Sequence, residues 1–131
     1  MADKRDRYRI PKGVKKEALQ GRDLRAMHGY GGGKVTKAIN RKLRYQKDVG
    51  YKTAVKIDTY YRRHEKVDPP AKNFGDRKNP SKGYIMWKMM GGDSGHRWSR
   101  QLQKTLDVIQ KKEKLNKIIN IVEAIQLGVL R

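Results

Sequence analysis

Apolar residues recur every three or four positions along several stretches of the chain, which is the period of an amphipathic helix. On this pattern helices are predicted from about Lys15 to His28, from Lys34 to Gln46 and from Tyr51 to Glu65. The glycine run 29–33 separates the first two, and a short turn at residues 48–50 separates the other two. The clearest stripe, on the middle helix, consists of Val35, Ala38, Ile39 and Leu43.

The second half of the chain begins with a loop at residues 66–80, where prolines and glycine lie among charges. Asn79-Pro80 predicts a helix start, because Asn caps and Pro suits the first helical position. Residues 83–90 are apolar on nearly all sides, and the Asn-Pro start favours a short buried helix over a strand. After a tight Gly91-Gly92 turn, Asp93 is expected to cap the next helix.

The last predicted helix begins near Ser94 and contains no Pro or Gly before Gly128. Its two apolar series are out of phase, which indicates either a bend near residues 111–113 or two different packing partners. The first series is Trp98, Leu102, Leu106 and Ile109, and the second is Leu115, Ile118, Val122, Ile125 and Val129.

These elements predict a mainly α fold, a small single-domain bundle of about five helices with a long or bent C-terminal helix. We expect a flexible basic arm at residues 1–14, a helical domain at 15–103 and an amphipathic C-terminal helix at 104–131. The expected core consists of Val35, Ala38, Ile39, Leu43, Tyr61, Trp87 and Trp98.

Charge decides the expected chemistry. Among 131 residues, 33 Lys and Arg stand against 13 Asp and Glu, which gives a net charge of +20. Such an excess disfavours the compact state unless a polyanion or salt screens it. No apolar run is long enough to span a membrane, and there is no cysteine for a disulfide or a thiolate site. We therefore expect a nucleic-acid partner, DNA before RNA, and no membrane partner.

The predicted contacts lie mostly on the second and third helices, with mobile charge added by Lys4, Arg5 and Arg7 of the arm. Two helices around a short glycine-containing turn are also compatible with a helix-turn-helix, although ordinary solvated faces of a bundle would look similar. The candidate nucleic-acid-binding residues are Lys34, Lys37, Arg41, Lys42, Arg44, Lys52, Lys56, Arg62, Arg63 and Arg97.

Other chemistry is weaker in this sequence. The glycine run could bind a phosphate at the helix start, but a plain turn explains it better. The tyrosines could stack bases, and packing of their rings explains them better. A metal-dependent nuclease site would have to use His64, Glu65, Asp68, Asp93 and His96, whose spacing matches no ligand pattern. We expect no catalytic residue, no metal and no cofactor.

The C-terminal apolar series predicts an interaction surface. Leu115, Ile118, Val122 and Ile125 could dock on the chain's own core, on a second copy or on another protein. The series covers barely two heptads, which is short for a coiled coil.

Four segments together resemble a small domain found in tailed-bacteriophage and prophage proteins. They are Gly31-Gly32 through Val35 and Ala38, Tyr60 to Glu65 followed by Asp68, Asn79 to Trp87, and Gly91 to Trp98. The resemblance covers about residues 18–103 and implies a phage origin rather than a particular reaction. This chain has Met89-Met90 where such domains carry an aromatic or Leu-rich stretch, and the tail from Lys104 lies outside the match.

The sequence thus favours a phage-encoded basic accessory protein that binds nucleic acid through phosphates. It would act in the bacterial host cytoplasm or be packaged in the virion. The alternatives are a virion structural or assembly protein that oligomerises or docks through its C-terminal helix, and a nuclease or host-takeover factor.

Overall fold

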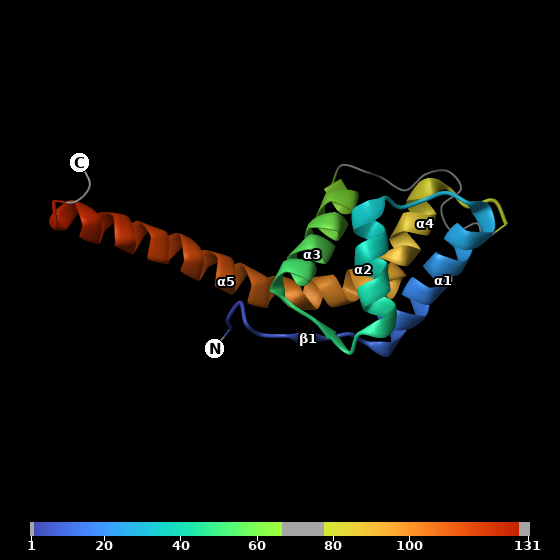
Figure 1. The fold of residues 1–131 in the computed structure, drawn as a ribbon, viewed down its shortest axis with the longest axis horizontal. Helices are drawn as coiled ribbons and strands as arrows, with labels where there is room; N and C mark the ends of the chain where they lie inside the picture. Colours follow the sequence, from blue (N-terminus) through green and yellow to red (C-terminus); the bar gives the residue numbers. More distant parts are fainter. Residues whose placement is uncertain (1, 67–77, 129–131) are drawn as a thin grey trace.

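A computed structural model of the chain describes residues 2–66 and 78–128, with the side chains of residues 65 and 66 left out. The described part is mainly helical, as predicted, and it ends in one long helix (Figure 1). Its elements are β1 (Tyr8–Arg9), α1 (Lys12–His28), α2 (Lys34–Tyr45), β2 (Asp48–Val49), α3 (Tyr51–Lys66), α4 (Lys82–Met89) and α5 (Gly92–Gln126). Most of the expected loop at residues 66–80 lies outside the described residues.

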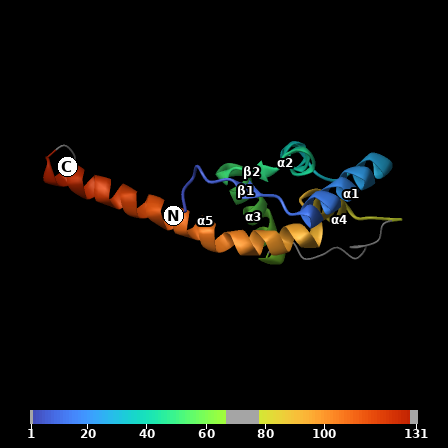
Figure 2. The same ribbon diagram turned by 90° about the horizontal axis from the view of Figure 1, so that it is seen from below.

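The helices form a small body from which the second half of α5 projects (Figure 1). Within the body α1 packs on α4, α5 and α2, and α3 packs on α5. Figure 2 shows α2 and the strands on one side of the body and α5 on the other. Helix α5 is continuous for 35 residues, so the long C-terminal helix is confirmed, whereas the bend near residues 111–113 stays a prediction.

Part of the N-terminal segment, where a flexible arm was expected, is paired and buried. Strand β1 pairs antiparallel with β2, with Tyr8 opposite Val49, and Ile10 is only 3% exposed. Helix α1 begins at Lys12, directly after Pro11, whose fixed φ suits the residue before a helix. The expectation of a flexible arm at residues 1–14 is therefore wrong for residues 8–14, since pairing and burial hold them.

The core lies between the helices and contains both tryptophans. Ile39, Leu43, Tyr61, Trp87 and Trp98 are buried as predicted. Two core predictions on α2 are wrong, because Val35 is 59% exposed and Ala38 is also exposed. The buried face of α2 is turned away from them and consists of Thr36, Ile39, Asn40 and Leu43.

The short buried helix predicted for residues 83–90 is confirmed as α4. Its cap was predicted wrongly. The side chain of Ser81, rather than Asn79, accepts a hydrogen bond from the backbone N–H of Tyr84 at 3.1 Å. Pro80 consequently precedes the helix instead of occupying its first turn. Among the described helices, none combines the length and apolar character needed to cross a membrane.

Candidate nucleic-acid interface

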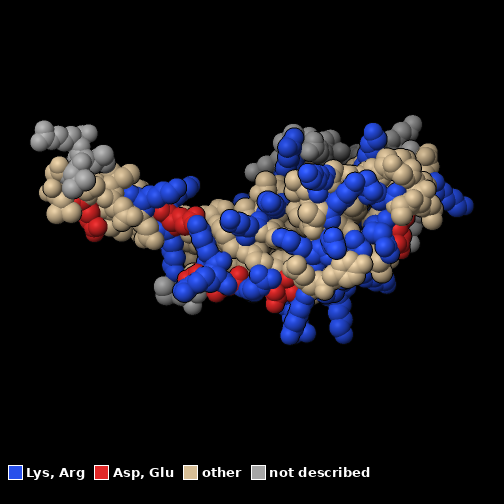
Figure 3. Space-filling view, viewed as in Figure 1, with Lys and Arg blue, Asp and Glu red and all other residues tan. Residues whose placement is uncertain are grey.

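Six exposed cations lie on α2 and the first half of α3. We call them the basic face: Lys34, Lys37, Arg41, Lys42, Lys52 and Lys56. Figure 3 shows Lys and Arg side chains gathered over this side of the body, with few acidic residues between them. The sequence contains no Asp or Glu between Asp23 and Asp48, and Asp48 pairs with Arg7 at 2.6 Å. Within the described part of the chain, none of the six cations pairs with a carboxylate.

Buried polar contacts fix the rotation of α2 that turns these cations outward. Asn40, 1% exposed, donates to the carbonyl oxygens of Ala18 at 2.9 Å and Met89 at 2.8 Å. Its own side-chain oxygen accepts from Arg44 Nε at 2.8 Å. Because Asn40 joins α2 to α1 and α4, the positions on the opposite side of α2 face solvent.

Shallow grooves run along both sides of α2. On the α3 side, Lys34, Lys42 and Lys56 share a groove with Thr53. On the α1 side, Lys16, Arg22 and Arg44 line another groove together with Tyr45. Sequence reasoning missed Lys16 and Arg22, because nothing local to α1 shows that this helix lies beside α2.

Tyr45 differs from the other tyrosines. Its ring is at the end of α2, 72% exposed, with the Arg44 guanidinium 4.9 Å from its centroid. The prediction that tyrosines pack inward is confirmed for Tyr61 and Tyr84, which are buried. For Tyr45 it is wrong, and this ring is accessible to a base or sugar.

The remaining predicted contact residues are not part of this surface. Arg62 is held by Asp58 at 2.9 Å and Asp107 at 3.2 Å, so its charge is already paired. Arg97 lies on α5 and donates to Ser94 Oγ at 3.2 Å. Arg63 is exposed near the end of α3 and has a partner of its own.

The arm cations are also engaged. Lys4 pairs with Glu113, Arg5 with Asp3 at 3.2 Å, and Arg7 with Asp48. The expectation that these residues supply mobile charge is therefore not met. The pair of Lys4 with Glu113, together with the hydrogen bond from Lys112 Nζ to the carbonyl oxygen of Ala2, holds this segment against the middle of α5.

The connection between α2 and α3 does not have helix-turn-helix geometry. It contains strand β2, and α2 packs on α1 and α4 whereas α3 packs on α5. In a helix-turn-helix, a short turn joins the two helices directly. The helix presented to solvent here is α2, the first of the pair.

The glycine run before α2 is shaped by its backbone. Gly29, Gly31 and Gly32 have φ values of 76°, 98° and 72°, in the left-handed region that favours glycine. Arg25 Nε donates to the carbonyl oxygen of Gly31 at 2.9 Å, which ties the run to α1. These features account for the glycines as a tight turn, and phosphate binding here stays a prediction.

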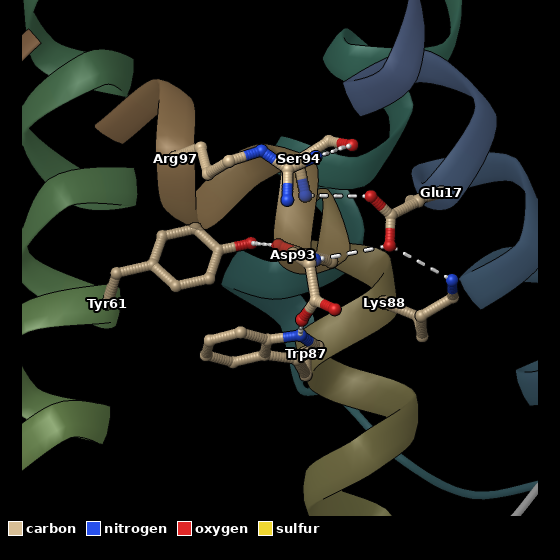
Figure 4. A network of polar contacts seen from close by, with 8 residues as sticks. Glu17, Tyr61, Trp87, Lys88, Asp93, Ser94 and Arg97 are labelled. Atoms are coloured by element: carbon tan, nitrogen blue, oxygen red, sulfur yellow. Dashed lines mark hydrogen bonds and ion pairs between the residues drawn. The ribbon is translucent and has the colours of Figure 1, made fainter. Parts of the chain in front are cut away.

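The most distinctive sequence motif surrounds the start of α5 and performs a different task (Figure 4). Glu17 of α1 accepts hydrogen bonds from the backbone N–H groups of Asp93 at 3.1 Å and Ser94 at 2.7 Å. It also accepts from Lys88 Nζ at 3.1 Å, and this lysine is 6% exposed. Burial alone would raise the pKa of Glu17, but the bonds from Ser94 and Lys88 outweigh it and lower the pKa.

Asp93 was predicted to cap α5, and that prediction is wrong. Its carboxylate instead accepts from the indole N–H of Trp87 at 3.0 Å, while Glu17 provides the cap. Glu17 lies 77 residues before Ser94, so no local pattern could have identified it.

The glycines of the motif permit close approach. A Cβ on Gly95 would lie 2.5 Å from the hydroxyl oxygen of Tyr61, and one on Gly92 would overlap the Glu17 carboxylate. Tyr61 donates to the carbonyl oxygen of Gly92 at 3.0 Å. Burial raises the pKa of Tyr61 well above 10, so the hydroxyl keeps the proton that it donates. These contacts join α1, α3, α4 and α5 at one point.

The histidines of the same region pack against aromatic rings. His64 lies 4.6 Å from Trp87, and His96 stacks on Tyr61 at 5.3 Å, measured between ring centroids. Asp68 and the Glu65 side chain lie outside the described residues. In the described part of the chain, no three His, Asp or Glu side chains are grouped to hold a metal ion.

In comparisons of this chain with protein-family models, curated proteins and solved structures, no match was found. The functional argument therefore rests on the geometry of the chain itself.

Proposed function

We propose that this protein binds nucleic acid, duplex DNA first, through phosphate contacts made by the basic face. The observation that carries the proposal is the six exposed cations on α2 and α3, which are close together and unpaired with any described carboxylate. Acidic side chains elsewhere in the body form ion pairs with other cations, such as Asp58 with Arg62 and Glu17 with Lys88.

Phosphate contact suits these residue types. Each Lys or Arg that neutralises a phosphate releases condensed counterions, and the logarithm of affinity falls by about 0.9 per contact for each tenfold rise in salt. Arg41 can donate two parallel bonds to one phosphate, whereas the lysines act as mobile point charges. This chemistry reads no sequence, so we expect similar affinity for unrelated duplexes.

The biological setting rests on a different argument. Only the resemblance of residues 18–103 to a phage domain supports a phage-encoded accessory protein, acting in the bacterial cytoplasm or packaged with DNA. Of the segments that carry this resemblance, Gly31 to Ala38 includes the start of α2, and the others include the end of α3, most of α4 and the start of α5. The setting and the binding activity are therefore separate proposals.

Fluorescence anisotropy with a labelled duplex, repeated at several salt concentrations, tests the binding proposal. The double variant Lys37→Gln/Arg41→Gln removes two charges from the basic face. Because both contacts go to phosphates, the slope of log affinity against log salt should fall by about 1.8. The matched control, Lys104→Gln/Lys117→Gln, removes the same charge from exposed positions on α5 and should keep the wild-type slope.

Two results would contradict the proposal. One is no binding of duplex, single-stranded DNA or RNA between low and physiological salt. The other is an equal loss of salt slope in both double variants, which would show that net charge matters rather than this surface.

Tyr45→Ala adds a second measurement. If this variant loses affinity for single strands but not for duplex, the Tyr45 ring stacks on bases at the end of α2.

A virion structural or assembly role is the second candidate. It is favoured by the aliphatic side chains that the projecting part of α5 presents to solvent. These side chains would serve a protein partner rather than a nucleic acid.

A further inference from the structure

The projecting part of α5, residues 114–126, which we call the tail, carries an exposed aliphatic surface. We call this surface the tail face. Its six side chains are between 43% and 58% exposed. They are Leu115, Ile118, Ile119, Ile121, Val122 and Ile125.

The tail face cannot cover the body of its own chain. Successive residues of a helix are about 100° apart around its axis. On this spacing, the centre of the tail face lies roughly 180° around α5 from the positions that α5 buries in the body. The positions used for this centre are Leu115, Ile118, Val122 and Ile125. Those buried positions include Trp98, Leu106 and Ile109. Because α5 is continuous, the two apolar surfaces point in opposite directions, and the described part of the chain leaves the tail face exposed.

We propose that a second copy of this chain covers it, in an antiparallel helix pair. At about 180 Å² for a fully exposed aliphatic residue, the tail face offers roughly 560 Å² per chain and 1,100 Å² for two copies, near the lower limit of about 1,200 Å² for stable interfaces. The stems of the neighbouring lysines add to this area. The area fits a dimer that forms and dissociates with concentration.

Charge favours the antiparallel direction. The first half of the tail is preceded or flanked by four lysines, Lys111, Lys112, Lys114 and Lys117. In the second half, at residues 120–126, the only charged residue is Glu123. A parallel pair would place the two lysine groups side by side. An antiparallel pair centred between Ile118 and Ile119 places Leu115 of each copy opposite Val122 of the other and holds the two lysine groups at opposite ends of the pair. It also keeps the two basic bodies at opposite ends, which reduces their repulsion.

Sedimentation equilibrium on nuclease-treated full-length protein, from about 5 to 300 μM at 0.3 M salt, tests the proposal; the salt screens the bodies from each other. The wild-type mass should rise with concentration from 15.2 kDa towards twice that value. Ile118→Gln/Val122→Gln should stay at the monomer mass. The matched control, Asn116→Gln/Asn120→Gln, changes the opposite side of the tail and should dimerise as the wild type does.

The folded body provides an internal check. Trp87 and Trp98 lie in the body, so their fluorescence should be unchanged in both double variants, which separates loss of pairing from loss of fold. A monomer mass for the wild type over the whole range overturns the proposal, as does dimerisation that survives Ile118→Gln/Val122→Gln. Neither outcome bears on the basic face, because no nucleic acid is present.

The direction of pairing can be tested because the chain has no cysteine. In the antiparallel pair, Leu115→Cys lies about 10 Å along the axis from the same position in the second copy, too far for a disulfide. A mixture of Leu115→Cys and Val122→Cys should therefore cross-link under mild oxidation, whereas Leu115→Cys alone should not. Efficient cross-linking of Leu115→Cys alone would show a parallel pair and overturn the stated geometry.

Discussion

Replacing Glu17 with Gln should destabilise the protein more than any loss of a surface carboxylate. The side chain of Glu17 is 17% exposed and accepts from two backbone N–H groups at the start of α5 and from the buried Lys88. Gln keeps the shape and one acceptor oxygen, but its amide cannot replace the carboxylate. We expect a loss of about 1 kcal/mol from the cap and about 2 kcal/mol from the unpaired lysine, roughly 3 kcal/mol in all.

A loss of this size is easy to measure. For a chain of this length it corresponds to a fall in Tm of about 10 °C, which can be followed by far-ultraviolet circular dichroism. The matched control is Asp23→Asn on the same helix, because Asp23 pairs with Arg22 at an exposed site. Surface pairs contribute little, so the control should stay within about 0.5 kcal/mol of the wild type.

The dependence on pH gives an independent check of the same contact. Because the pKa of Glu17 lies below its ordinary value of 4.5, its contribution is complete above that pH and is lost as the pH falls through the folded pKa. The difference in stability between the wild type and Glu17→Gln should therefore shrink in acid. A variant as stable as the wild type at pH 7, or a difference that does not change down to pH 3, would refute the role assigned to Glu17.

Two further substitutions test the packing around the helices. Gly95→Ala should destabilise the protein, since its Cβ would meet the Tyr61 hydroxyl at 2.5 Å, whereas Gly33→Ala meets nothing within 4 Å and should leave Tm nearly unchanged. Asn40→Ala should lower the free energy of unfolding in urea by about 2 kcal/mol, because two buried carbonyl groups lose their donor. Stability equal to the wild type in Gly95→Ala or Asn40→Ala would show that these contacts are not formed.

The helices could be predicted because their apolar period is a local property of the chain. The rotation of α2 could not. Hydrophobicity favours Val35 and Ala38 as core positions, yet Thr36 and Asn40 are buried in their place. Burying Asn40 is favourable only because Ala18 and Met89 supply acceptors from two other helices. Those partners are brought together by the fold, so the sequence pattern of α2 alone does not reveal them.

The candidate site, like the helices, could be predicted in its location but not in its detail. Charge density identified α2 and the start of α3, but it could not separate exposed cations from those that the fold pairs internally. Arg62 and Arg44 look like Arg41 in the sequence, yet Arg62 is held by two aspartates and Arg44 by Asn40 and Tyr45. Strands β1 and β2, of two residues each, are too short for any period, so the engagement of the arm was also missed.

The most distinctive residues of this sequence and its proposed binding residues are therefore different sets, for a physical reason. Joining four helices at the start of α5 requires particular side chains at particular positions, because Gly95 must admit Tyr61 and Glu17 must reach the helix end. Phosphate binding requires only cations free of acidic neighbours, which many lysine and arginine patterns satisfy. A sequence motif can thus report the fold while function resides on a less distinctive surface. Two variants separate binding from folding. Lys37→Gln/Arg41→Gln should reduce the affinity for nucleic acid without lowering the stability of the protein. Glu17→Gln should lower the stability without changing the slope of log affinity against log salt.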